Sequence, residues 1–144
     1  MRDILIQKLH GHLLRSHPDL LVALQEQAGV AAYLEERVAN LENMPETLLL
    51  EGRPAFIVEE VCMEALKKDL PASRFNYLSS ILQEEFEPEY YAWLKSGILT
   101  YELINILQEA VPVFEQVGFS EQIENDRLLR YAIIGTIRQY LDSD

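Results

Sequence analysis

The sequence predicts an all-α protein, a compact bundle of about six to eight helices of mixed length. Apolar residues recur three and four positions apart along most of the chain, which places them on one face of a helix. No segment alternates apolar and polar residues over the length of a strand, and no Asn-Gly or Asp-Gly hairpin turn occurs. With 144 residues the chain can bury a core without a disulfide or metal, and its single cysteine excludes an internal disulfide.

The N-terminal segments predict three helices. Leu5, Leu9 and Leu13 lie four positions apart and form one apolar stripe over about residues 2–15. The "SHPD" stretch ends this helix, because a residue before proline is pushed out of the helical conformation and Pro18 suits the first turn of a new helix. Gly29 is a joint before a third helix, "VAAYLEERVANLEN".

The stretch from Asn43 to Pro54 contains two prolines and a glycine and has no clear period. It predicts a connector that holds at most a short helix around Thr47–Leu50. We expect a single domain over residues 1–144, in which an N-terminal helical part, residues 1–50, packs on a C-terminal helical part, residues 51–144. Pro54 then opens the clearest helix, "AFIVEEVCMEALKKDL", which Pro71 ends.

The second half predicts further helices, each bounded by a cap, a proline or a glycine. Ser73 is the expected cap of "RFNYLSSILQEEF", and Pro88 opens a short helix that ends at Gly97. The helix "ILTYELINILQEAV" follows and is expected to stop or kink at Pro112, because proline lacks the N–H that a helix interior needs.

Glycine and serine positions predict where the last helical segments begin and end. A turn or two, "PVFEQVG", is expected to close at Gly118, and Ser120 is a candidate cap for the last helix. Gly135 lies in the middle of that helix, where glycine costs about 0.8–1 kcal/mol against alanine. We therefore expect it to allow another helix to approach closely.

The net charge of the chain limits which classes of partner are expected. The chain carries 24 acidic and 12 basic side chains, a net charge of −12. Between Gln83 and Asp126 the only basic side chain is Lys95, against ten acidic ones. Nucleic-acid affinity comes largely from Lys and Arg, so neither a nucleic acid nor an anionic membrane is the expected partner. No apolar run approaches a membrane span, and charges interrupt the apolar N-terminus, so a cytoplasmic protein is expected.

The three histidines, His10, His12 and His17, lie within eight positions but do not have metal-ligand spacing. Two helical ligands of one metal lie three or four residues apart, whereas His10 and His12 point about 200° apart. Solvent-facing histidines, or a helix-end position for His17, are expected instead. No glutamate is followed three residues on by a histidine, as a di-metal bundle would require.

Cys62 is the other candidate for chemistry. It lies in "VEEVCMEAL", among acidic and apolar residues that raise a thiol's pKa, so a core cysteine is expected rather than a nucleophile. The sequence contains neither a Gly-x-Ser-x-Gly motif nor a glycine-rich phosphate loop. We therefore expect no catalytic, cofactor-binding or metal-ligating residues.

The segment "EEFEPEYYAWLKSG" is the one local candidate for binding, because its aromatic residues are interleaved with four acids. Tyrosine and tryptophan are enriched at interface hot spots, and an acidic rim suits a basic partner. The candidate partner-binding residues are Tyr90, Tyr91, Trp93, Glu87 and Glu89. The alternative is that Phe86, Tyr90 and Trp93 belong to the core and the acids form its rim. In either case Tyr91 is expected to face outward.

From Arg53 onward the chain carries "RPAFIVEEVCMEALKKDLPASRFNYLSSILQEEF", then "PVFEQVGFS" and "YAIIGTIRQYL". Over about residues 30–144 this pattern resembles an uncharacterised bacterial domain family found in short, acidic, helical proteins. The resemblance implies an all-α fold and a cytoplasmic bacterial protein, and it carries over no catalytic residues. The family's middle helices run into a Leu-x-Phe-Ser-x-Tyr turn, from which "LPASRFNYL" departs at Pro71 and Ala72.

Three function classes stay open at this point. The leading hypothesis is a non-enzymatic helical interaction module that binds a protein partner, or a second copy of itself as a homodimer, through an acidic-aromatic surface. The alternatives are a small-molecule or metal-dependent enzyme and an acidic mimic of nucleic-acid phosphates. An enzyme requires a cleft in which titratable groups converge, and an interaction module requires an exposed apolar patch. A mimic of nucleic acid requires regular rows of acids on its surface.

Overall fold

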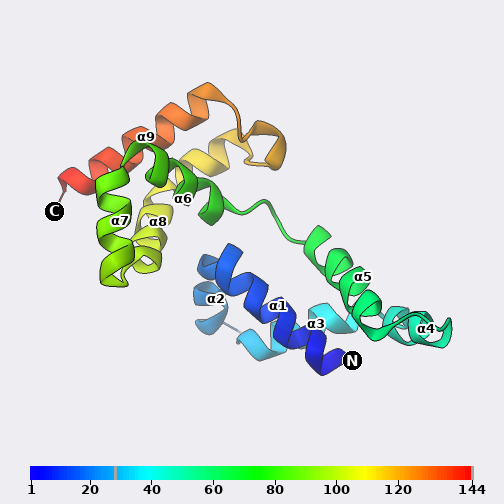
Figure 1. Cartoon of the computed structure of the whole chain (residues 1–144). Coiled ribbons are helices and arrows are strands. Elements are labelled where there is room, and N and C mark those ends of the chain that lie inside the picture. The colour runs from blue at the N-terminus through cyan, green and yellow to red at the C-terminus, as the bar shows by residue number, and fades with distance from the viewer. Residues whose placement is uncertain (28, 144) are drawn as a thin grey trace. The chain divides into compact units, whose positions relative to one another are not determined.

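The computed structural model describes residues 1–27 and 29–143, and it confirms the all-helical class (Figure 1). These residues form nine α-helices and one short 3₁₀ helix and no strand, so the expected six to eight helices was slightly low. The elements are α1 (Arg2–Ser16), α2 (Pro18–Gln25), α3 (Val30–Ala39), α4 (Met44–Leu50), α5 (Ala55–Lys68), α6 (Arg74–Glu85), α7 (Glu87–Ser96), α8 (Leu99–Val117), η1 (Glu121–Ile123) and α9 (Arg127–Asp142).

The chain forms two compact units. The first consists of Met1–Arg15 with Leu20–Pro71, and the second of Ser16–Asp19 with the residues from Ala72 onward. The change of unit falls at Pro71 and not near residue 50, because α5 shares one core with the N-terminal helices. Its Val58 and Cys62 are fully buried in the same cluster as Leu9 of α1 and Val38 of α3.

The first unit is built on the stripe expected from the sequence. Leu5, Leu9 and Leu13 of α1 are at most 1% exposed. Gly29, with φ 96°, is the joint between α2 and α3. The expected connector contains α4, which begins three residues before Thr47, with Pro45 in its first turn, where a missing N–H costs nothing.

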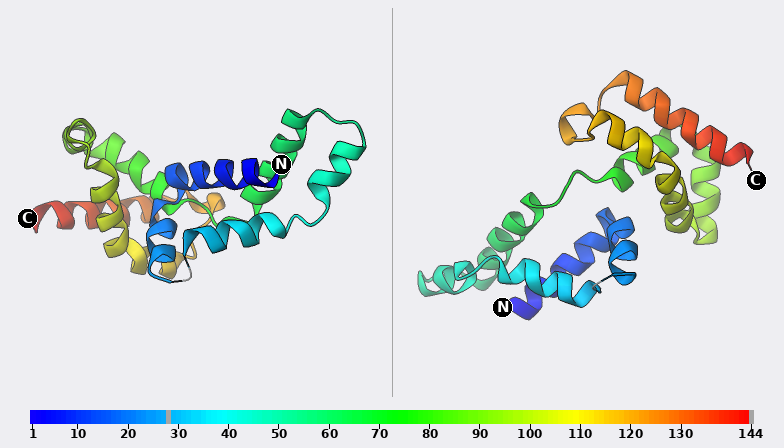
Figure 2. Two further views of the ribbon diagram at one scale, coloured as in Figure 1. Left: turned by 90° about the horizontal axis from the view of Figure 1, so that it is seen from below. Right: turned by 180° about the vertical axis from the view of Figure 1, so that it is seen from behind.

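The second unit packs α6, α8 and α9 against one another, with α7 against α6 and α8 (Figure 2). Ser73 caps α6 as expected, since its Oγ accepts a hydrogen bond from the N–H of Asn76 at 3.0 Å. The fully buried centre of this core consists of Leu78, Leu82, Ile106, Ala110, Phe114, Ile133 and Ile137. This unit holds the candidate binding segment.

Of the two outcomes expected at Pro112, a stop or a kink, the stop is wrong, because α8 continues through Pro112 to Val117. Pro112 lies on the exposed side of the helix, while Ala110 and Phe114 on either side of it are fully buried. Burial of the apolar face therefore outweighs the lost hydrogen bond. The expected separate turn "PVFEQVG" is the last part of α8, which ends where Gly118 adopts φ 63°.

The last helix differs from expectation in two ways. Asp126, and not Ser120, caps α9: its Oδ2 accepts from the N–H of Leu129 at 3.0 Å, whereas Ser120 precedes η1 and its side chain makes no cap bond. The close approach expected at Gly135 is also wrong. A Cβ added there would meet nothing within 4 Å among the described residues.

Gly135→Ala is expected to raise the free energy of unfolding by about 0.5–1 kcal/mol, because alanine loses less conformational freedom than glycine in an open helical position. Urea denaturation measures the change. Gly118→Ala is the control: at φ 63° a Cβ is strained, so this variant should be destabilised. A loss of stability in Gly135→Ala would contradict the open position.

Candidate functional site

The segment singled out in the sequence forms α7 and its two ends. Glu87 and Glu89 lie in its first turn, where negative charge is favoured by the helix dipole. At the other end Gly97 adopts the left-handed conformation, φ 78°. Its N–H bonds the carbonyl of Leu94 at 3.2 Å, and the N–H of Ile98 bonds that of Trp93 at 3.0 Å. These paired bonds end the helix sharply and turn the chain into α8.

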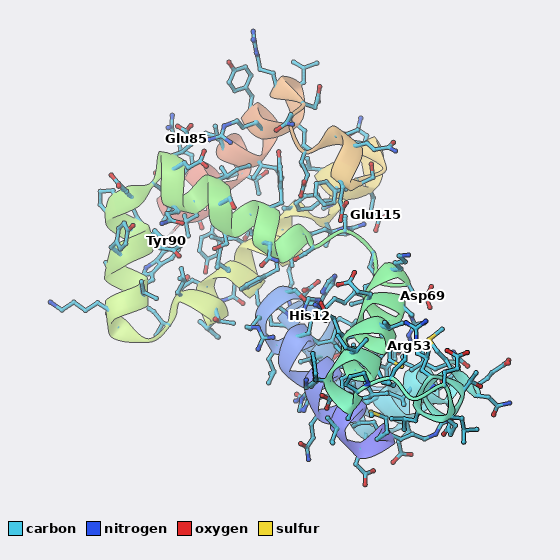
Figure 3. All side chains as sticks on the ribbon, turned by 45° about the vertical axis from the view of Figure 1, so that its right-hand side comes forward. His12, Arg53, Asp69, Glu85, Tyr90 and Glu115 are labelled. Carbon is cyan, nitrogen blue, oxygen red and sulfur yellow. The ribbon has the colours of Figure 1, made fainter. Side chains whose placement is uncertain are left out.

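The aromatic residues of this segment divide between core and surface. Phe86 is buried, and Tyr90 and Trp93 are partly buried against the core of the second unit; Tyr90 is labelled in Figure 3. Tyr91 is 48% exposed, so the expectation that it faces outward is confirmed. The candidate residues therefore do not share one exposed surface, because successive helical positions point about 100° apart.

Tyr91 belongs instead to a group that the sequence analysis missed. Leu94, Ile98 and Tyr101 are 52%, 40% and 65% exposed, and together with Tyr91 they make up what we call the α7–α8 surface. Their spacing of three, four and three residues places them on both sides of the turn at Gly97, with Tyr91 and Leu94 on α7 and the other two at the start of α8. That spacing was the available signal, and it lay outside the aromatic cluster.

Neighbouring side chains position Tyr91. Its hydroxyl accepts a hydrogen bond from Nε2 of Gln83 on α6 at 3.1 Å. Its ring lies edge-on to that of Tyr90, with the centroids 5.1 Å apart and the planes at 82°. A side chain held in this way loses less rotamer freedom when a partner covers it.

The acids of the second unit are only partly neutralised. Arg130 pairs with Glu84 at 2.7 Å and with Glu85 at 2.9 Å, and Arg74 pairs with Glu115 at 3.4 Å. Among the described residues, five other acids between Gln83 and Asp126 make no ion pair and no side-chain hydrogen bond: Glu87, Glu89, Glu109, Glu121 and Glu124. Glu87 and Glu89 are on α7, so the helix that carries Tyr91 and Leu94 also carries uncompensated negative charge.

One tryptophan variant and one tyrosine variant test this division of the aromatic residues between core and surface. Trp93→Ala is expected to lower the melting temperature by several degrees, because it removes an aromatic ring from the core. Tyr91→Ala is expected to leave the free energy of unfolding within about 0.5 kcal/mol. Thermal unfolding followed by circular dichroism measures both. If both variants unfold, Tyr91 is a core residue and the surface does not exist.

The three histidines differ in how deeply they are buried. His10 and His12 are half-buried on α1, and His17, which directly follows α1, is 7% exposed, with its Nδ1 2.7 Å from Oγ of Ser16. The helix-end position expected for His17 is therefore confirmed, and His10 and His12 are only partly open to solvent. In the part of the chain that the structure describes, no three His, Cys, Asp or Glu side chains are grouped to hold a metal ion.

Cys62 lies in the core of the first unit and is 0% exposed, as expected. Burial raises the pKa of its thiol above the ordinary 9.0, and the charge of Glu46 raises it further, while Arg2 lowers it. The thiolate is the reactive form, so this cysteine is inert in the folded protein.

A groove of about 600 Å³ lies between α1 and α5 in the first unit, and the sequence analysis did not find it. His12, labelled in Figure 3, lines it together with Lys8, Arg15, Glu59 and Glu64. Lys8 pairs with Glu59 at 3.5 Å. The two signs of charge largely compensate each other here, so the groove offers no strong preference for a charged ligand.

No model of a known protein family matches the chain, and no curated protein and no solved structure matches it either. Among the described residues no helix combines the length and apolar character that crossing a membrane requires.

Proposed function

We propose that this protein is a non-enzymatic interaction module whose α7–α8 surface binds a basic amphipathic helix of a partner protein. One observation carries the proposal: four exposed apolar side chains flank the turn between α7 and α8, in the most acidic part of the chain. An exposed cluster of large apolar residues with a polar rim is typical of a protein-binding site.

The chemistry of the partner follows from two components, the exposed apolar side chains of the α7–α8 surface and the acids of α7. Tyr91 and Tyr101 are large amphipathic side chains that supply contact area and hydrogen bonds, as hot-spot residues do. Their neighbours Leu94 and Ile98 add apolar area, and each such side chain contributes about 1.5–3 kcal/mol when fully covered. The acids Glu87 and Glu89 of α7, unpaired among the described residues, attract a basic partner and speed its association. An amphipathic helix with a basic face supplies apolar side chains for the first component and positive charge for the second.

Charge also favours a different protein over a second copy. Each copy carries a net charge of −12, and two acidic surfaces brought together repel. The single free thiol is consistent with a cytoplasmic setting, which is part of the proposal.

A titration of ¹⁵N-labelled protein with a synthetic peptide tests the proposal. The peptide has about 18 residues, with leucines on one helical face and arginines on the other, and a scrambled peptide of the same composition is its control. We expect chemical-shift changes centred on Tyr91, Leu94, Ile98 and Tyr101, and an affinity that falls with added salt. The double variant Tyr91→Ser, Tyr101→Ser should weaken binding by at least about tenfold.

The matched control is Leu128→Ser with Tyr131→Ser, which removes two exposed apolar side chains from α9 of the same unit. These residues are 77% and 59% exposed, so their loss should leave both stability and peptide binding unchanged. Equal binding by the scrambled peptide, or by the Tyr91 and Tyr101 variant, would refute the proposed surface. Dimerisation that Tyr101→Ser abolishes would assign the surface to a second copy.

A further inference from the structure

The second unit contains a pocket of about 250 Å³ outside the α7–α8 surface. Its polar lining comes from α6, from the segment before α9 and from α9 itself. The residues are Asn76, Ser80 and Glu84 on one face of α6, Glu124 and Asn125 after η1, and Arg130 on α9. The volume holds one side chain rather than a drug-sized ligand.

Tyr77 also lines this pocket and is 7% exposed. Its ring is fixed by the core, with centroids 6.0 Å from Phe114 and 5.1 Å from Phe119. Its hydroxyl is buried and has no hydrogen-bond partner among the described residues. An unmet buried hydroxyl costs about 1–3 kcal/mol, so this group favours the arrival of a polar partner.

The charges around the hydroxyl decide which partner. Burial raises the pKa of Tyr77; the charge of Arg130 lowers it, and those of Asp126 and Glu124 raise it. Arg130 is engaged by two carboxylates, Glu84 and Glu85. Glu124 makes no ion pair with any described residue, so a negative charge is left over. A bound anion would be repelled, whereas a cation with several N–H donors would find acceptors on the tyrosine, the asparagines and Glu124.

We infer that this pocket, named here the Tyr77 pocket, receives an arginine side chain of the basic partner. A guanidinium offers five donors in a planar fork and is more weakly hydrated than an ammonium, so it suits a small, partly buried ring of acceptors. The inference rests on the proposed function, which supplies a basic partner. Gln83, which holds Tyr91 in the α7–α8 surface, directly precedes Glu84 of the pocket, so α6 contributes residues to both sites.

The test uses a probe that carries one guanidinium and no other charge, N-acetyl-arginine N-methylamide. Its control is the citrulline analogue, which has the same shape without the charge. In a titration of ¹⁵N-labelled protein to about 50 mM, the arginine probe is expected to shift the side-chain amides of Asn76 and Asn125, with half-saturation in the millimolar range. The citrulline probe should shift them at least about fivefold less.

Two variants and one control locate the binding. Glu124→Gln and Tyr77→Phe are each expected to weaken the arginine probe by about threefold or more. Tyr77→Phe should fold as well as the parent protein or better, since it removes an unmet hydroxyl. Glu109→Gln, which neutralises an exposed acid of α8 that does not line the pocket, should leave binding unchanged.

The outcomes separate this inference from the proposed function. Unchanged probe binding in Glu124→Gln, equal binding of the citrulline probe, or no shifts of the two asparagines each overturn the Tyr77 pocket. If the amphipathic peptide nevertheless binds and depends on Tyr91 and Tyr101, the α7–α8 surface stands without the pocket. If the probe binds as described and the peptide does not, the pocket stands and the proposed helix-binding surface falls.

Discussion

Phe114→Ala is expected to lower the free energy of unfolding of the second unit by about 3–5 kcal/mol, the largest effect of any single change proposed for this protein. Phe114 is 0% exposed in the middle of the core. Its ring lies edge-on to Tyr77 and to Phe119, with centroids 6.0 and 5.0 Å away, and the guanidinium of Arg74 lies 5.4 Å from its centre. Truncation therefore leaves a cavity and removes three aromatic or cation contacts at once.

Urea denaturation of Phe114→Ala measures this loss, and Phe56→Ala is its control. Phe56 is the same residue type but 66% exposed, so its truncation should change stability by about 0.5 kcal/mol or less. The end of α8 should also fray in Phe114→Ala, because Phe119, which follows Gly118, packs on the ring that is removed. Similar midpoints for the two variants would show that α8 is not the centre of this core.

Leu9→Ala is expected to lower the free energy of unfolding of the first unit by about 2–5 kcal/mol. Leu9 is 1% exposed and lies on α1 in the cluster that also contains Leu34 and Val38 of α3 and Val58 and Cys62 of α5, so its truncation weakens a core shared with two other helices. A thiol reagent reports the effect directly. Cys62 is buried in the same cluster, and its rate of alkylation should rise as the unit opens more often.

Leu14→Ala is the matched control, since Leu14 lies on the same helix and is 56% exposed. We expect it to leave both the unfolding midpoint and the alkylation rate of Cys62 nearly unchanged. A faster rate in Leu14→Ala equal to that in Leu9→Ala would contradict the assignment of the buried face of α1. The pair also tests the division into units, because neither variant should alter peptide binding at the α7–α8 surface if the second unit stays folded.

The candidate site could be predicted from the sequence only in part. Composition placed an acidic, aromatic segment between Glu84 and Gly97, and the structure forms a helix there. The choice between buried and exposed aromatics was correct for Phe86 and Tyr91. The other residues of the α7–α8 surface were missed, since Leu94, Ile98 and Tyr101 lie beyond the acidic run and two of them follow the turn at Gly97. Whether such residues are covered depends on packing between α7 and α8, which local patterns do not contain.

The Tyr77 pocket could not be predicted at all. Its lining residues come from two stretches of the chain, Asn76 to Glu84 and Glu124 to Arg130, more than thirty residues apart in the sequence. Tyr77 lies in an ordinary apolar stripe, and nothing in the pattern shows that its hydroxyl lacks a partner. That property belongs to the arrangement of three segments around one atom.

The sequence by itself determined the helices and most of their ends. The side chain of Ser73 caps the start of α6, and the left-handed backbone of Gly97 and Gly118 ends α7 and α8. Such caps and turns are interactions between residues only a few positions apart in the sequence. The tertiary structure decided what such local rules cannot contain. Pro112 is carried within α8 because Ala110 and Phe114, two positions before and after it, are fully buried. The helix α5 joins the first unit because Cys62 belongs to the same core cluster as Leu9. These outcomes depend on burial of apolar area between distant segments, which is larger than the local preferences that it overrides.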